Sequence, residues 1–165
     1  MFFYYFYNLL TSPGVMMHEL SHAFFCVMAG VKIHKIKLFQ FGRLAGYVEH
    51  DEPQKFYQGF FVSLGPLFIN TLFTLFAFSQ FREPFMRLQP WVWVWLGFAA
   101  GMHAIPSTQD AKSLFGLANR RFWRNPLVII GYPFVLALYI LNFLKRLHID
   151  IIFVGALFWL GRFYL

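Results

Sequence analysis

Two histidines and a glutamate near the N-terminus form the pattern in this sequence that could do chemistry. They lie in the segment Met17-His18-Glu19-Leu20-Ser21-His22. On a helix, residues four apart share one face, so His18 and His22 can offer two imidazole nitrogens to one Zn²⁺. A zinc ion with three protein ligands leaves its fourth position to water and lowers the pKa of that water to about 7. Glu19 is then the candidate base that takes the proton.

The composition of the chain makes this short motif more informative. Of the 165 residues, 59% are hydrophobic, 22% are aromatic and only 13% are charged, and the mean hydropathy is +0.54. These values lie outside the usual range of soluble domains and predict an integral membrane protein. Ionisable residues are costly inside a bilayer and usually serve a function there. We therefore interpret the three residues as a functional site in a membrane-embedded helix.

The net charge of +7 indicates membrane topology and not a nucleic-acid partner. The basic residues cluster between apolar segments, as in the cytoplasmic loops of membrane proteins. With five spans, ten of the fourteen Lys and Arg residues fall on the side that holds residues 30–58 and 119–125. This bias predicts that this side is cytoplasmic and that the N-terminus faces outward, in a multi-pass protein of the cell membrane. The single Cys26 allows no internal disulfide and is interpreted as a packing residue.

Five apolar segments are predicted to span the membrane. They cover approximately residues 2–29, 59–79, 90–117, 126–144 and 149–165. The first is longer than a hydrocarbon core of ~30 Å requires, so it tilts or breaks at residues 11–14. A break would make Ser12 the N-cap and Pro13 the first helical residue. Pro106 interrupts the third span, because proline lacks an N–H and crowds the preceding turn.

A different periodicity follows the first span. Residues 31–38 alternate apolar and polar side chains, which is typical of a strand, and residues 44–50 could return as its partner after Phe41-Gly42-Arg43. We expect a short β-hairpin over residues 31–50 at the membrane surface, with an unstructured basic loop as the alternative. The predicted fold class is an all-α polytopic membrane protein with about five transmembrane helices and this hairpin.

Three motifs in this order resemble those of the site-2 protease family of intramembrane zinc metalloproteases. They are the His18–His22 segment, Gly65-Pro66-Leu67-Phe68-Ile69-Asn70 in the second span, and Pro106 followed by Asp110 in the third. The resemblance covers residues ~13 to ~118, the extent of the catalytic core in that family. It implies a zinc-protease core of three helices. It also implies the roles of the motif residues: His18, His22 and Asp110 hold zinc, Glu19 is the base, and Asn70 contacts the substrate.

The third motif departs from the pattern of that family, which has Asn-x-x-Pro well before an Asp-Gly pair. Here His103 holds the Asn-like position and Ala111 follows Asp110. Residues 107–110 also fit a helix-capping box, so Asp110 could serve as a cap while His103 binds the metal. Helix depth favours Asp110: it and the two histidines lie about 15 Å from the cytoplasmic ends of their helices, against about 25 Å for His103. His103 is then expected beside the substrate or behind the ligands.

Two functions remain open on this evidence. The first is an intramembrane zinc endopeptidase that cleaves transmembrane segments of membrane proteins, as in regulated intramembrane proteolysis. The second is a non-proteolytic membrane protein that uses the same residues as a structural zinc site and acts by partner binding or permeation. We expect a catalytic membrane core over residues 1–118 and two additional transmembrane helices over 119–165. The sequence shows no PDZ-like or nucleotide-sensing domain, so substrate choice falls to this core or to a regulatory membrane partner.

Overall fold

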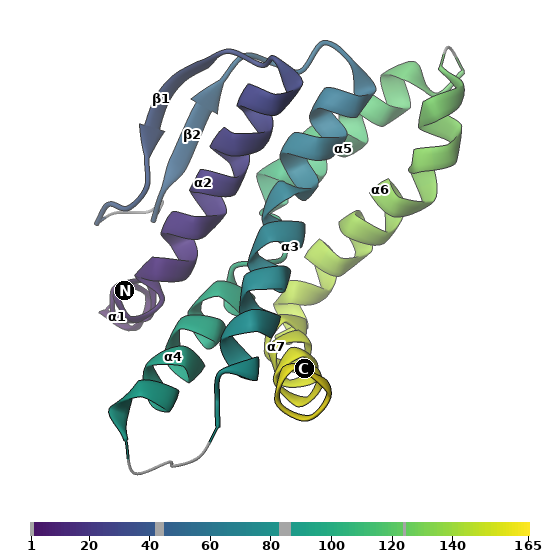
Figure 1. Ribbon diagram of the computed structural model, residues 1–165. Coiled ribbons are helices and arrows are strands. Elements are labelled where there is room, and N and C mark those ends of the chain that lie inside the picture. Colours follow the sequence, from purple (N-terminus) through teal and green to yellow (C-terminus); the bar gives the residue numbers. More distant parts are fainter. Residues whose placement is uncertain (1, 42–44, 83–86, 124) are drawn as a thin grey trace.

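The computed structural model describes residues 2–41, 45–82, 87–123 and 125–165. This part of the chain is mostly helical, with seven α-helices and one small antiparallel sheet (Figure 1). The predicted helical character of all five apolar segments is confirmed. In chain order the elements are α1 (Phe2–Leu10), α2 (Ser12–Ala29), β1 (Ile33–Lys37), β2 (Tyr47–His50), α3 (Phe56–Ser79), α4 (Leu88–Met102), α5 (Thr108–Arg121), α6 (Pro126–Leu144), a 3₁₀ turn (Lys145–Leu147) and α7 (Ile149–Tyr164).

The first apolar segment breaks where the sequence predicts. α1 ends at Leu10, and α2 begins at Ser12 with a proline in its first turn. The N-cap is Thr11, one residue before the predicted Ser12, and its hydroxyl donates to the Tyr7 carbonyl at 2.9 Å. α1 is seen end-on in Figure 1 whereas α2 is seen lengthwise, so the two helices meet at a steep angle. At its other end α2 stops at Gly30, which has a positive φ of 68° that glycine adopts without strain.

The third apolar segment forms two helices, α4 and α5, which are separated at residues 103–107 around Pro106, as predicted. A break exposes carbonyl groups that no longer have helical partners. Three of these carbonyls accept hydrogen bonds from side chains outside α4 and α5, so the break has a fixed shape. The donors are His18 Nδ1 to the His103 carbonyl, Lys145 Nζ to that of Ile105 and Asn142 Nδ2 to that of Pro106, at 2.6, 2.9 and 3.0 Å.

β1 and β2 pair as an antiparallel hairpin, which confirms the strand interpretation of this loop. The register places Ile36 opposite Val48 and Lys37 opposite Tyr47. Residues 42–44, including the Gly42 and Arg43 of the expected turn, lie outside the described residues. The hairpin folds back alongside α2 (Figure 1), and Gly46 reaches Glu19 in the middle of that helix. At Gly46 the hairpin therefore lies beside the centre of α2. Its predicted position at the membrane surface stays a prediction.

Small residues allow α2, α3 and α4 to cross closely. A Cβ atom on Gly14 would overlap the carbonyl oxygen of Ala99, so the contact between α2 and α4 needs a glycine there. At the same crossing the fully buried Asn70 of α3 donates its amide to the carbonyls of Ala100 and Gly14, at 3.2 and 3.4 Å. These contacts hold the start of α2 near the break that follows α4.

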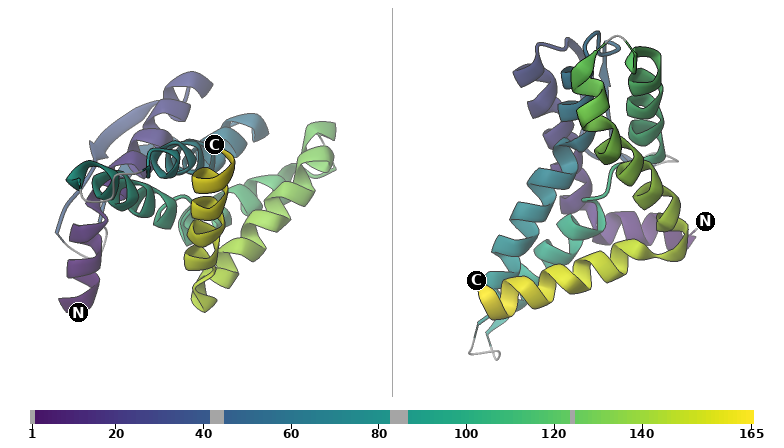
Figure 2. Two further views of the ribbon diagram at one scale, coloured as in Figure 1. Left: turned by 60° about the horizontal axis from the view of Figure 1, so that its bottom comes forward. Right: turned by 90° about the vertical axis from the view of Figure 1, so that its right-hand side faces the viewer.

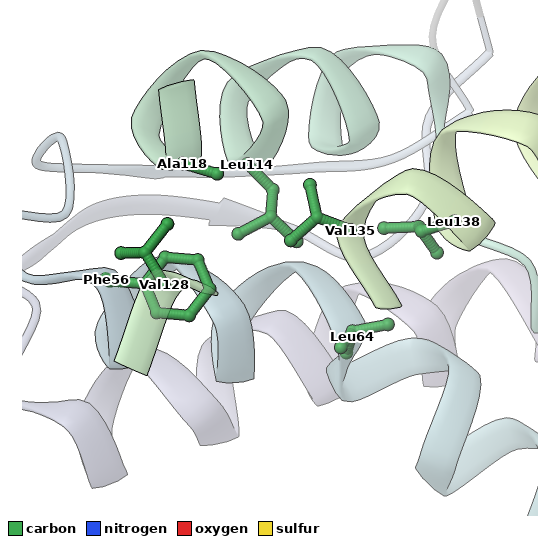
Figure 3. Packing of buried hydrophobic residues seen from close by; sticks show 7 residues of the cluster. All are labelled: Phe56, Leu64, Leu114, Ala118, Val128, Val135 and Leu138. Atoms are coloured by element: carbon green, nitrogen blue, oxygen red, sulfur yellow. The ribbon is translucent and has the colours of Figure 1, made fainter. Parts of the chain in front are cut away.

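A second packing region joins α3, α5 and α6. Figure 3 shows its buried side chains, which are Phe56, Leu64, Leu114, Ala118, Val128, Val135 and Leu138. Residues on both sides of position 118 thus share one hydrophobic cluster. The part of the chain predicted as two additional helices packs directly against the part predicted as the catalytic core.

Two helices, α3 and α6, are long and apolar enough to cross a membrane. Both also present large apolar side chains to the surroundings, for example Leu72 and Ile130, which are 67% and 70% exposed. Extended exposed apolar surface is unusual in a protein surrounded by water. The two helices therefore suggest that the chain associates with a membrane.

Candidate metal centre

His18 and His22 of α2 and Asp110 of α5 converge on one point. Their ligand atoms all lie within 4.8 Å of one another. The two Nε2 atoms are 3.1 Å apart, and Asp110 Oδ2 lies 3.4 Å from Nε2 of His22 and 3.9 Å from that of His18. Ligand atoms about 2.1 Å from a tetrahedral zinc lie roughly 3.4 Å from each other. The three separations span this value, so the group fits a metal ion of that size.

Hydrogen bonds behind each ring decide which nitrogen faces this point. His18 Nδ1 lies 2.6 Å from the His103 carbonyl oxygen, and His22 Nδ1 lies 2.9 Å from that of Val62. A carbonyl oxygen only accepts, so both Nδ1 atoms carry the proton and both Nε2 atoms present a lone pair. Metal-binding histidines are usually oriented in this way.

Two lone pairs and a carboxylate oxygen thus meet in a nearly closed space. His18 and His22 are only 9% and 5% exposed. A proton can bridge two of the three atoms but not all of them, whereas a divalent cation satisfies all three at once. Imidazole and carboxylate ligands occur together in zinc, iron and other transition-metal sites. The group can therefore hold a metal, and the choice of zinc belongs to the proposed function.

Asp110 is positioned by the residue that starts its own helix. Its Oδ2 accepts from the backbone N–H and the hydroxyl of Ser107, at 2.9 and 2.6 Å, and its own N–H is 3.2 Å from the Ser107 hydroxyl. The capping box is therefore formed, and the same Oδ2 faces the two histidines. The sequence left helix cap and metal ligand as alternative roles for Asp110. In the structure its carboxylate can serve both roles at once. Sequence reasoning missed that Ser107 orients Asp110, although the Ser-x-x-Asp spacing carried that signal.

His103 lies behind His18 and outside the group of three. Its carbonyl accepts from His18, and its Nε2 is 2.9 Å from the Thr11 hydroxyl. Because that hydroxyl donates to the Tyr7 carbonyl, it accepts from His103 Nε2–H. His103 thus ties the break after α4 to the junction of α1 and α2. Its predicted contact with a substrate stays a prediction.

Glu19 borders open space on two sides of the metal group. One cavity of about 150 Å³ is lined by Glu19, the three ligand residues and strand β2. The other, of about 320 Å³, lies between α1 and the start of α7, and its polar lining residues include Asn8, His103 and Lys145. Within the described residues no hydrogen bond holds the Glu19 carboxylate. The side chain is therefore free to meet a water molecule or a substrate atom beside the metal.

The larger cavity brings further polar side chains near Glu19. Lys145 lines it and donates to the Ile105 carbonyl, and burial lowers the pKa of its ammonium group. Asn8, from α1, is buried and also lines this cavity. Both cavities include His18, Glu19, Gly46 and Ser107, so they adjoin at the metal group.

Strand β2 forms a wall of the smaller cavity through Tyr47, Val48 and His50. β1 occupies one edge of β2, and no other strand in the described part of the chain pairs with the second edge. Gly46, just before the strand, allows the close approach: a Cβ there would lie 2.8 Å from Cγ of Glu19 and 2.7 Å from the Leu38 carbonyl oxygen. The sequence showed this glycine, but nothing local in it indicated the contact.

Asn70 does not line either of these cavities. Its amide nitrogen links α3 to α2 and α4, and its Oδ1 has no hydrogen-bond partner among the described residues. In this conformation Asn70 connects three helices through its amide nitrogen, and its Oδ1 can still accept a hydrogen bond. Its predicted role in holding a substrate stays a prediction.

Comparison of the chain with family models, with curated proteins and with solved structures gave no match. The function therefore has to be inferred from the residues and the geometry of this site.

Proposed function

We propose that this chain is a multi-pass membrane protein that acts as an intramembrane zinc endopeptidase, as its resemblance to the site-2 protease family implies. One observation carries the proposal: three metal-ligating side chains meet beside an unbonded carboxylate at the edge of a cavity. A structural zinc site normally has four protein ligands and is closed. Here the described residues supply three ligands, and the fourth side borders open space next to Glu19. That arrangement favours hydrolysis over a structural role.

The reaction is hydrolysis of a peptide bond. Zinc held by His18, His22 and Asp110 would supply Lewis acidity, which acidifies the attacking water and polarises the scissile carbonyl. Glu19 takes the proton from the water as the oxygen attacks the carbonyl carbon. It then delivers that proton to the amine as the C–N bond breaks. Ser107 and the carbonyls of Val62 and His103 keep the ligands oriented during these steps.

The substrate is a transmembrane segment of another protein, and it must be extended at the point of cleavage. Carbonyls within a helix are already hydrogen-bonded and shielded, so the segment has to unwind locally. β2 could hold a substrate in an extended conformation. Its second edge lacks a described strand partner, and its side chains line the cavity beside Glu19. An extended substrate can add to that edge by backbone hydrogen bonds.

The bilayer surrounds the helices that hold the ligands. The two histidines lie about ten residues from the end of α2 at Gly30, about 15 Å into the membrane. Non-helical backbone is tolerated at that depth only where protein covers it or water reaches it. The hairpin meets this condition, since it packs on α2 and lines a cavity. The surplus of basic residues on the hairpin side supports a cytoplasmic position for that side.

The test is co-expression with candidate single-span membrane proteins, comparing wild type with Glu19→Gln. The amide cannot accept the proton from water, so cleavage should fall by about 10²-fold or more while both histidines still bind. Elemental analysis should find zinc in both proteins. Glu52→Gln is the matched control, since Glu52 lies at the surface and should not affect cleavage. Cleavage by Glu19→Gln at nearly the wild-type rate would rule out this role for Glu19, and zinc without any cleavage by the wild type would favour the structural site.

A further inference from the structure

α7 runs across α3 and α6 instead of alongside them. In Figure 1 α7 is seen end-on while α3 and α6 are seen lengthwise, and the right-hand view of Figure 2 shows α7 lengthwise across one end of the molecule. Its buried residues Val154, Leu157 and Gly161 form one stripe. A Cβ on Gly161 would lie 2.9 Å from the Leu75 carbonyl oxygen, so this stripe packs against the last turns of α3.

His148 turns the chain into this direction. It has φ 56° and ψ 35°, the left-handed conformation, and it is the one residue other than glycine with a positive φ in the described ranges. That conformation is disfavoured for an L-residue with a side chain. It stands directly between the 3₁₀ turn after α6 and the first residue of α7. The change of direction is thus built into the backbone at one residue.

α3 sets the level of α7 relative to the membrane, because the hydrocarbon core is ~30 Å thick. α3 has 24 residues and extends about 36 Å, so it crosses with residues to spare. α7 packs against α3 close to its end at Ser79. In the proposed multi-pass arrangement, this end lies where the hydrocarbon gives way to the headgroups.

The outer surface of α7 suits that level. Six of its exposed residues are large and apolar, and two of these are the amphipathic aromatics Trp159 and Tyr164, which are 53% and 67% exposed. Tryptophan and tyrosine are enriched where the acyl chains meet the headgroups. The remaining exposed large residues on the helix are Ile151, Ile152, Leu160 and Phe163.

We infer that α7 lies in the plane of the membrane at its outer interface, with its exposed face against lipid, and does not cross the bilayer. The inference rests on the multi-pass arrangement proposed above. It replaces the fifth span expected from the sequence, so that the crossings are α2, α3, the α4–α5 pair and α6. Arg162 then stays on the outer side. The inner side carries nine Lys and Arg residues and the outer side five, so the inner side still has more basic residues.

Cysteine labelling tests this directly, because Cys26 is the only cysteine in the sequence and is buried. In a Cys26→Ala background, single cysteines replace Ile152 near the start of α7 and Phe163 near its end. A membrane-impermeant maleimide is applied to intact cells and to permeabilised cells. We expect both positions to label from outside without permeabilisation, because thiols at the level of the headgroups remain within reach of water. Labelling of position 152 from outside and of 163 only after permeabilisation, or of neither position in intact cells, would overturn the inference.

Two control positions separate this inference from the proposal on which it rests. Leu88→Cys, at the exposed start of α4, should label from outside, and Gln54→Cys, in the exposed turn before α3, only after permeabilisation. If these two label from the same side, the multi-pass arrangement itself is wrong. If they label from opposite sides while positions 152 and 163 also differ, only the in-plane position of α7 is wrong.

Discussion

The Oδ2 atom of Asp110 has neighbours of two kinds. It accepts two hydrogen bonds from Ser107, which begins α5, and it faces the Nε2 atoms of His18 and His22 across 3.4–3.9 Å. The two Ser107 donors favour the ionised carboxylate, which is the form that binds a metal. The atom that caps the helix is therefore also held in the orientation that a metal ligand needs.

Asp110 and His103 are separable by mutation. We expect Asp110→Ala to lose its zinc, because one of three ligands is removed, and His103→Ala to keep it, because the carbonyl that orients His18 belongs to the backbone. The measurement is the metal-to-protein ratio of the purified variants. Asp110→Asn is the matched control: its side-chain oxygen can still accept from Ser107, so α5 should stay intact while zinc binds at least 10-fold more weakly. Zinc lost from His103→Ala alone would reverse the assignment.

At this scale the convergence of the three side chains was predictable and their orienting partners were not. Helical spacing paired His18 with His22, and helix depth favoured Asp110 over His103. The carbonyls of Val62 and His103 belong to other helices, and a backbone acceptor has no signature in a sequence. The role of Asn70 was inferred by resemblance alone, and the buried packing of its side chain gives it another role in this conformation.

Among the elements, the hairpin depends on one close contact. Gly46 approaches Glu19 so closely that a Cβ would need a shift of the strand or of the carboxylate. Gly46→Ala should therefore lower cleavage by about 10²-fold, since small displacements of catalytic groups have effects of that size. The zinc content should stay at the wild-type level. Cleavage is measured with a substrate that the wild type processes.

Gly116→Ala is the matched control for Gly46, because nothing lies within 4 Å of a Cβ at that position in α5. It should leave both cleavage and zinc unchanged. Proline at Ile36 or Val48 removes a backbone donor from the hairpin and should reduce cleavage with zinc intact. Wild-type cleavage in Gly46→Ala and in both proline variants would show that the hairpin does not present the substrate.

The element boundaries followed from local sequence signals. Pro13 and Pro106 marked the two helix breaks, and alternation marked the strands. The position of the hairpin beside the centre of α2 did not follow, because it depends on the contact of Gly46 with a residue far away in the sequence. The direction of α7 did not follow either, since hydropathy reports how apolar a helix is and not which way it points.

At the scale of the whole molecule, the crossing of α2 and α4 sets the distance between the metal ligands and the break after α4. Gly14→Ala forces a Cβ into the Ala99 carbonyl, which no change of rotamer can relieve. We expect this variant to lose about 1–3 kcal/mol of stability, as overpacked cores do, and to bind zinc more weakly. Thermal unfolding in detergent measures the first effect and elemental analysis the second.

Gly155→Ala is its control, because a Cβ there meets nothing within 4 Å. It should unfold at nearly the wild-type temperature. Equal stability of the Gly14→Ala and wild-type proteins would mean that α2 and α4 are not in close contact.

The proposed ligands come from α2 and from α5, so a bound metal would join two segments that the chain itself connects only through two other helices and a hairpin. Any ion that binds the folded form and not the unfolded one shifts the folding equilibrium, by about 2.7 kcal/mol at a hundred times its dissociation constant. For a protein of marginal stability this is a large share of the total. The zinc supply of a cell would then control how many copies escape degradation, in addition to how many are active.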